Sequence, residues 1–295
     1  MCGIAGEIRF DGVEPDVAAV ARITAEMHRR GPDGSGVYAA GHVALGHRRL
    51  KILDLSERGA QPMVDPELGL AATFNGLIYN YRELRAELEA AGYRFFSTSD
   101  TEVLLKAFHR WGAACVERFL GMFAFGIVER DSGVLTLGRD RLGVKPLYVA
   151  ESPDLLRFAS SLPALLACGG VDTSIDPVAL HHYMTFHSVV PAPRTILAGI
   201  RKLPPATVRT VRPDGSGDER VYWRPEHVRR PEHAGMGARD WADAVLEALR
   251  LAVRRRMVAD VPVGVLLSGG LDSSLVVALL AGEGQQGDHQ RGVQP

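Results

Sequence analysis

Short apolar runs, separated by turns rich in Gly, Pro and Asp, fill the first 210 residues of the chain. Runs of this length predict β-strands over residues 4–10, 43–45, 52–53 and 70–74. Apolar residues at helical spacing predict a helix over residues 16–29. Because strands dominate and only a few helices accompany them, the pattern predicts a layered α+β domain.

Capping residues predict two further helices in this part of the chain. Asn80 and Glu83 have the spacing of a capping box, which predicts a helix over residues 81–91. Asp100 is predicted to cap the next helix, over residues 101–111.

Composition excludes several classes of protein. The formal net charge is −1, so no general affinity for nucleic acid or for acidic membranes is expected. No apolar stretch is long enough for a membrane span, and the N-terminus lacks the pattern of a signal peptide. Cys2, Cys115 and Cys168 have no CxxC spacing, which argues against a disulfide framework and a zinc site. A reducing cytoplasm suits a chain of this kind that carries a reactive thiol.

A change in composition divides the chain. Residues 1–212 form the expected α+β domain, and residues 213–239 are polar and rich in turns, which predicts a linker. Residues 240–282 begin with a predicted helix and continue with an apolar run at 263–267, a Gly-rich loop and a second helix. This succession predicts the opening of a parallel α/β domain. Residues 283–295 have the composition of a disordered tail.

Cys2 directly follows the initiator methionine and is small enough for Met1 to be trimmed. Trimming would place a thiol and a free α-amino group on the same residue. An α-amino group has an unperturbed pKa of about 7.7–8.0, so it can act as the general base for its own side chain. Taken alone, Cys2 is better explained as an incidental residue of a frayed terminus, and the residues that follow reverse this interpretation.

Two segments supply chemistry that fits such a nucleophile. Arg49, in a His-Arg-Arg-Leu run, carries a guanidinium that can hold a carboxylate through two parallel hydrogen bonds. Asn75 offers a side-chain N–H and Gly76 an unobstructed backbone N–H, and two such donors can form an oxyanion hole. Each segment alone also fits a surface Arg pair or an Asn-Gly turn.

The loop at residues 268–274 follows a clean apolar run and precedes a predicted helix. Its glycines let backbone N–H groups converge, and the helix N-terminus favours an anion. The loop lacks the GK[ST] signature of a Walker motif. The pattern predicts a pyrophosphate-binding loop, in which Asp272 is placed to hold Mg²⁺ or a ligand amine.

Taken together, these motifs occur in an order that resembles the glutamine-hydrolysing asparagine synthetase family, from residue 2 to about residue 282. Residues 161–165 and 181–194 are closer to the amidotransferases that make N-acetylglutaminylglutamine amide. The motifs that carry the resemblance are Cys2-Gly3-Ile4, Arg30-Gly31-Pro32-Asp33, His47-Arg48-Arg49-Leu50, Asn75-Gly76-Leu77-Ile78-Tyr79-Asn80, Ser99-Asp100-Thr101-Glu102, Gly121-Met122-Phe123-Ala124-Phe125, the run from Gly138 to Tyr148, and Ser268-Gly269-Gly270-Leu271-Asp272-Ser273-Ser274.

The resemblance implies an N-terminal-nucleophile domain, a four-layer αββα sandwich, followed by an incomplete α/β ATP-pyrophosphatase domain. Cys2 would attack the side-chain amide of glutamine, and its own α-amino group would move the protons. Asn75 and Gly76 would stabilise the oxyanion. Arg49 would hold the α-carboxylate of glutamine, and Asp100 would hold its α-ammonium.

The resemblance also implies the remaining site residues and partners. Ile52 and Leu53 would line the glutamine pocket together with Leu77. Ammonia would travel to the second domain, where ATP would activate a carboxylate acceptor, aspartate or a small peptide, in a cytoplasmic enzyme that could form a homodimer. The implied ATP-binding residues are Leu267, Ser268, Gly269, Gly270, Asp272 and Ser273, with Asp272 as a Mg²⁺ ligand.

Two departures from the family pattern leave alternatives open. Many members carry Glu where this chain has Leu77, so Asp100 and backbone carbonyls must bind the ammonium without it. The chain also stops after the first strand–helix unit of the synthetase domain, which predicts a truncated enzyme that retains at most the glutaminase half-reaction. The alternatives are a non-catalytic fragment and a sugar-phosphate or phosphoribosyl amidotransferase, against which the pyrophosphate-type loop argues.

Overall fold

The computed structural model describes residues 1–228 and 230–288. The chain divides into two compact units, residues 1–224 and 225–295, and each is described separately. The first unit contains two six-stranded sheets.

Every strand pairing in the two sheets is antiparallel. The first sheet has the order β10-β8-β9-β1-β3-β2 and the second has the order β12-β11-β7-β6-β5-β4. The bounds of the first are β1 Gly3–Arg9, β2 Gly34–Ala40, β3 Val43–Arg49, β8 Tyr148–Glu151, β9 Leu155–Ala159 and β10 Arg201–Lys202. Those of the second are β4 Met63–Asp65, β5 Leu70–Ile78, β6 Gly121–Glu129, β7 Leu135–Arg139, β11 Thr207–Val211 and β12 Gly217–Val221.

The main core lies between the two sheets. Side chains from both, among them Leu45 and Phe158 of the first and Val128 and Leu137 of the second, are completely or almost completely buried in one cluster. Their inward positions alternate with outward ones along the strands, as the period of two requires. This core fixes the two sheets face to face and so fixes the distance between strands β1 and β5, which carry the candidate site.

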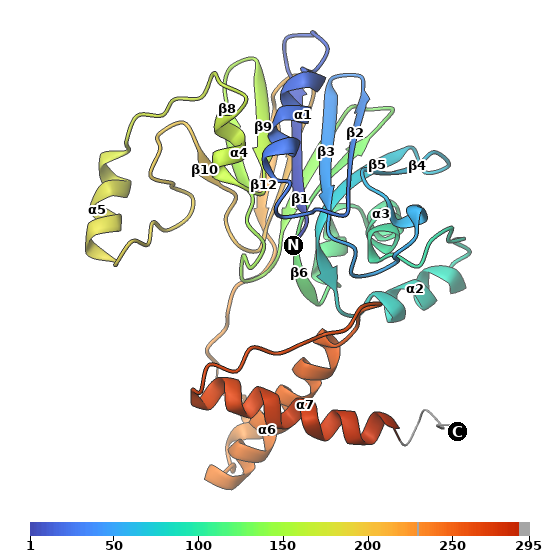
Figure 1. The fold of residues 1–295 in the computed structure, drawn as a ribbon, viewed down its shortest axis with the longest axis vertical. Coiled ribbons are helices and arrows are strands. Elements are labelled where there is room, and N and C mark those ends of the chain that lie inside the picture. The colour runs from blue at the N-terminus through green and yellow to red at the C-terminus, as the bar shows by residue number, and fades with distance from the viewer. Residues whose placement is uncertain (229, 289–295) are drawn as a thin grey trace. The chain divides into compact units, whose positions relative to one another are not determined.

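Helices cover the outer face of each sheet (Figure 1). α1 (Val17–Glu26) and α4 (Leu162–Leu166) pack on the first sheet, where Ile23 and Leu165 join a second buried cluster. α3 (Asp100–Trp111) packs on β5, and α2 (Tyr81–Ala90) packs on α3. The predicted αββα sandwich is therefore confirmed. The remaining elements of the unit are α5 Pro177–Thr185, η1 Glu57–Gly59 and η2 Gly112–Glu117.

The caps of two helices differ from the prediction. Ser99, not Asp100, caps α3, because the Ser99 hydroxyl accepts from the Thr101 N–H at 3.1 Å. Asn80 precedes α2 but makes no capping bond. Its side chain instead donates to the Arg118 carbonyl at 3.0 Å and accepts from the Leu120 N–H at 2.9 Å, so a tertiary contact replaces the predicted capping box.

Residues 52–53 do not form the predicted strand. The chain bends there, and Asp54 follows with a positive φ of 51°. A left-handed residue breaks the extended geometry that a strand requires, and Asp tolerates that region better than most residues do. The apolar side chains of this segment line a pocket instead of a sheet.

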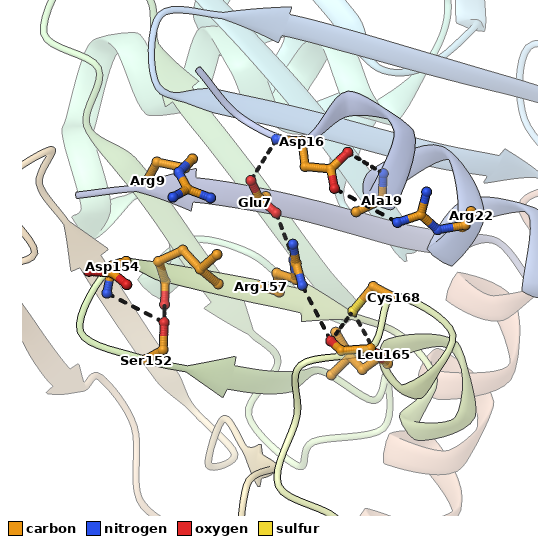
Figure 2. A network of polar contacts seen from close by, with 12 residues as sticks. Glu7, Arg9, Asp16, Ala19, Arg22, Ser152, Asp154, Arg157, Leu165 and Cys168 are labelled. Carbon is orange, nitrogen blue, oxygen red and sulfur yellow. Dashed lines mark hydrogen bonds and ion pairs between the residues drawn. The ribbon is translucent and has the colours of Figure 1, made fainter. Parts of the chain in front are cut away.

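A buried charge network holds β1 against its neighbours (Figure 2). The fully buried Glu7 accepts from the Asp16 N–H at 2.7 Å and pairs with Arg157 Nε of β9 at 2.6 Å. Asp16 in turn caps α1 by accepting from the Ala19 N–H at 2.8 Å. A buried carboxylate is tolerated when it is paired and hydrogen-bonded, so this network anchors the strand that begins immediately after Cys2.

The end of the first unit differs from the predicted linker. Residues 217–221 form β12, which pairs with β11, so part of the range 213–239 belongs to the second sheet. The polar composition of that range arises because β12 is an exposed edge strand.

The second unit contains η3 (Pro231–His233), α6 (Ala238–Arg256) and α7 (Leu271–Asp288). Residues 263–267 are not the predicted strand, because no strand among the described residues of this unit pairs with them. A parallel strand requires a neighbour and cover on both faces. α7 extends into the predicted tail as far as Asp288, and residues 289–295 lie outside the described residues. No described helix combines the length and the low polarity that a membrane crossing would need.

Candidate active site

Cys2 lies at the start of β1, where the strand meets the end of β3. Its Sγ is 3.3 Å from the Leu50 N–H, which donates to it, and 3.6 Å from the Leu50 carbonyl. Arg30 Nε donates to the Cys2 carbonyl at 3.1 Å. Met1 is present and 55 % exposed, so the Cys2 nitrogen is a peptide N–H in this structure. The second residue of the chain is thus held by its backbone and its side chain, and it is not part of a frayed terminus.

The Arg-Gly-Pro-Asp turn shapes this corner. A Cβ on Gly31 would lie 2.3 Å from the Arg48 carbonyl carbon, so only glycine allows the loop to approach β3 this closely. Asp33 accepts from the Lys51 N–H at 2.9 Å and donates its own N–H to the Arg49 carbonyl at 2.9 Å. The turn therefore holds the end of β3 next to Cys2.

A pocket of about 610 Å³, measured with its open mouth, surrounds the Cys2 side chain. Every residue predicted to act on glutamine lines it. These residues are Cys2, Arg49, Ile52, Leu53, Asn75, Gly76, Leu77 and Asp100. The chain segments that carry them come from both sheets and from α3, so tertiary folding alone brings them together.

Asn75 and Gly76 lie on β5, opposite Ala124 and Phe123 of β6. The N–H groups of Phe74 and Ile78 point away from β6, since they donate to Gln61 Oε1 at 2.7 Å and to Asp100 Oδ2 at 3.0 Å. Alternation along an antiparallel ladder places the Gly76 N–H, halfway between them, on the same side. It therefore faces the pocket that Gln61 and Asp100 line.

The Arg49 side chain is buried and is oriented by backbone carbonyls. Its Nη1 donates to the Ser56 carbonyl at 2.9 Å, and its Nη2 donates to the Asp54 carbonyl. Asp54 shapes this loop, because its carboxylate accepts from the Ser56 N–H at 3.1 Å and the Thr98 N–H at 2.9 Å. A guanidinium has five N–H donors, so donors remain for a ligand carboxylate.

Asp100 is the single carboxylate among the residues that line the pocket. Burial raises its pKa from the usual value to about 7, while the hydrogen bond from the Ile78 N–H opposes this shift. A cationic ligand group would restore the charged form. Leu77 is almost fully buried in the same wall, so the position where many family members carry Glu contributes only an apolar surface.

The thiol itself is not activated by its surroundings. Burial raises the pKa of Cys2, and the Leu50 hydrogen bond lowers it by a smaller amount. Burial likewise lowers the pKa of the Met1 α-amino group. A thiol that remains protonated needs a base before it can attack a substrate.

Gln61 and Lys145 are among the polar pocket residues to which the sequence analysis assigned no role. Gln61 donates from Nε2 to Thr101 Oγ1 at 3.1 Å and accepts from Phe74, so it joins β5 to α3. Lys145 is buried beside Met1, with Nζ 3.1 Å from the Met1 Sδ. The carboxylate of Asp140 accepts from the Lys145 N–H at 2.9 Å, which shapes this loop. The sequence signal that could have identified Lys145 is the motif from Gly138 to Tyr148, which contains both Asp140 and Lys145.

Gly76 leaves no room for a side chain. A Cβ there would lie 2.5 Å from the Met122 carbonyl oxygen and 2.7 Å from the Phe123 Cβ. We expect Gly76→Ala to lower the free energy of unfolding by about 2 kcal/mol, because overpacking forces β5 away from β6. Urea denaturation of the purified variant would measure this. Gly41→Ala is unsuitable as a control because of its positive φ, whereas Gly264→Ala places its Cβ in open space. Equal stability of the Gly76 variant and the parent chain would contradict the prediction.

The Gly-rich loop of the second unit carries the residues that the sequence predicts to bind ATP. Ser268, Gly269 and Gly270 directly precede α7, and Ser268 Oγ lies 3.0 Å from Ser273 Oγ. Leu267 is exposed, and the described residues hold no cluster of three metal-ligating side chains around Asp272 or elsewhere.

Comparison with known families agrees with this geometry. A model of the glutamine amidotransferase domain matches residues 1–223. The chain belongs to this family. An asparagine synthase model matches residues 244–290. The order of the two matched families confirms the resemblance to glutamine-hydrolysing asparagine synthetases.

Individual relatives of this glutamine amidotransferase family member are also glutamine-hydrolysing asparagine synthetases. Asparagine synthetase [glutamine-hydrolyzing] 1 of Bacillus subtilis is 39% identical over 85% of this chain and 38% of its own length. Asparagine synthetase [glutamine-hydrolyzing] 3 of the same organism is 36% identical over 96% of this chain and 45% of its own length. The chain therefore spans less than half the length of these relatives.

A solved structure supports the fold. Glutamine phosphoribosylpyrophosphate amidotransferase from B. subtilis matches with a TM-score of 0.56 at 16% identity, over 95% of this chain and 64% of the other. At this identity the likeness concerns the fold alone. It agrees with the two antiparallel sheets between helical layers.

Proposed function

We propose that the first unit hydrolyses glutamine to glutamate and ammonia. The observation that carries the proposal is the convergence of a thiol, two oxyanion donors, a guanidinium and one carboxylate on a single pocket. Arg49 binds the α-carboxylate of glutamine and Asp100 binds its α-ammonium, which places the side-chain amide toward Cys2.

The chemistry needs a free N-terminal cysteine, which removal of Met1 provides. The α-amino group of Cys2 takes the thiol proton as Sγ attacks the amide carbon. Asn75 Nδ2 and the Gly76 N–H stabilise the negative oxygen of the tetrahedral intermediate. The protonated amine then gives its proton to the departing ammonia, leaving a thioester. Water, activated by the same amine, attacks the thioester and releases glutamate.

We further propose that the ammonia serves an ATP-dependent amidation in the whole protein. The family match of residues 244–290 and the names of the relatives support a carboxylate acceptor, with aspartate giving asparagine. ATP and Mg²⁺ would be held in part by the loop at 268–273. We also propose that the enzyme works in the cytoplasm and forms a homodimer. The linker between the two units would begin after β12, which ends at Val221.

The direct test is release of glutamate from glutamine by the purified chain, after intact mass measurement has verified the loss of Met1. We expect turnover of glutamine and little of asparagine, whose shorter side chain does not reach Cys2 when Arg49 and Asp100 hold its backbone groups. No glutamate above the background of a heated sample would contradict the proposal. Longer versions of the protein, offered aspartate or N-acetylglutaminylglutamine with ATP, would distinguish the two proposed acceptors.

The oxyanion hole gives a separate prediction. Asn75→Ala removes one donor from a buried site, and we expect kcat for glutamine hydrolysis to fall about 10²-fold with little change in KM. Steady-state kinetics at pH 8 would measure both constants. Asn80→Ala, whose side chain bonds the Arg118–Leu120 turn, is the matched control. A rise in KM at constant kcat for Asn75→Ala would assign this residue to substrate binding instead.

A further inference from the structure

Ser160 follows the last residue of β9 and is 1 % exposed. Its N–H donates to the Ile4 carbonyl at 2.9 Å, and its hydroxyl accepts from the Ile4 N–H at 3.1 Å. Ile4 lies two residues after Cys2 on β1. Ser160 therefore continues the pairing of β9 with β1 through its backbone and its side chain.

The same hydroxyl also reaches the second sheet. Asn75 Nδ2, on β5, donates to Ser160 Oγ at 3.4 Å. One oxygen atom thus joins the strand of the predicted nucleophile to the side chain of the predicted oxyanion donor. Asn75 is itself 1 % exposed, so no solvent competes for this contact.

The hydrogen bond to Ser160 restricts the orientation of the Asn75 side-chain amide. An amide nitrogen has two N–H donors, and Ser160 occupies one of them. The second N–H is then fixed in the plane of the amide and remains available to an oxyanion in the pocket that Asn75 lines. Without an acceptor at Ser160, the amide can rotate about χ2 and present its oxygen, which would repel an oxyanion.

We propose that Ser160 is a positioning residue that holds the Asn75 amide in the donating orientation and ties it to the Cys2 strand. The proposal rests on the glutaminase function proposed above. It distinguishes Ser160 from its neighbour Ser161, which precedes α4 but makes no capping bond.

Kinetics of two serine variants test the proposal. We expect Ser160→Ala to lower kcat for glutamine about 30-fold while KM changes less than twofold, and Ser161→Ala to match the parent chain. Ser160→Cys, which fills the same space with a weaker acceptor, should retain an intermediate kcat. In an Asn75→Ala background, Ser160→Ala should cause no further loss, because the group that it positions is absent. An equal loss in both backgrounds, or none in either, would overturn the proposal.

An NMR measurement of the Asn75 side chain tests the role of Ser160 independently of glutaminase activity. The side-chain ¹H–¹⁵N signals of Asn75 can be assigned by their loss in Asn75→Ala. We expect these signals to shift and exchange faster with solvent in Ser160→Ala, but not in Ser161→Ala. Unchanged signals would overturn the proposal even if the parent chain proved inactive. Loss of the folded spectrum in both the Ala and Cys variants of Ser160 would assign this residue to the stability of β1 and would equally overturn it.

Discussion

Replacement of Cys2 by Ala is expected to abolish release of glutamate from glutamine, a loss of at least about 10⁴-fold. Cys2 carries the only thiol among the residues that line the pocket with the oxyanion donors, and a methyl group cannot form the thioester. The fold should persist, because the hydrogen bonds of Sγ are made to the backbone of Leu50, which remains in place. A coupled glutamate assay measures the activity, and thermal denaturation measures the stability.

Cys168→Ala is the matched control for this variant. Cys168 is also partly exposed, but it lies at the end of α4 and does not line the pocket. We expect it to retain full activity. Residual turnover in Cys2→Ala above one per cent of the parent rate would rule out Cys2 as the nucleophile.

Replacement of Asp100 by Asn is expected to lower kcat/KM for glutamine by about 10³-fold, mainly through KM. The ammonium of glutamine would lose its carboxylate partner in a buried wall where Leu77 offers none. Kinetics with glutamine at pH 8 would measure this loss. Asp131→Asn, on the exposed turn between β6 and β7, provides the control. A KM within twofold of the parent value would show that another group binds the ammonium.

The same variant should make the protein more stable. Because the pKa of Asp100 is about 7 when folded and near 3.8 when unfolded, the folded state binds the extra proton between these pH values. The free energy of unfolding therefore falls as pH rises from 4 to 7, and Asn removes this dependence. We expect Asp100→Asn to gain a few kcal/mol over the parent chain at pH 8 and almost nothing at pH 4. Urea denaturation at both pH values would measure the difference, and equal gains at both would contradict the titration of Asp100.

Much of the candidate site was predictable because its chemistry resides in short motifs. Cys2, Arg49 and Asn75 were chosen by residue type and order and Asp100 through the family resemblance, and the structure places all four in one pocket. Gln61 and Ser160 were not predicted, since their contacts join segments far apart in the sequence. No local pattern marks a serine that accepts from another sheet.

The errors in the predicted fold also arise from contacts between segments that are far apart in the sequence. Asn80 has the local chemistry of a cap, but the Arg118–Leu120 turn binds its side chain instead. The apolar run at 263–267 has the composition of a buried strand, yet a strand depends on neighbours that the described residues do not supply. Polar residues 217–221 form an edge strand because β11 offers them a partner. In each of these segments, tertiary contacts determine the local structure more strongly than the propensity of the local sequence does.

The order of strands in the first sheet has a consequence for synthesis of the protein. β1 is the first strand made, but it lies between β3 and β9, and β9 ends only at Ala159. Until those later residues leave the ribosome, one edge of β1 has no partner. An aminopeptidase therefore has most of the translation time of this unit to remove Met1. Removal of Met1, which the proposed chemistry requires, can therefore precede the pairing of the second edge of β1.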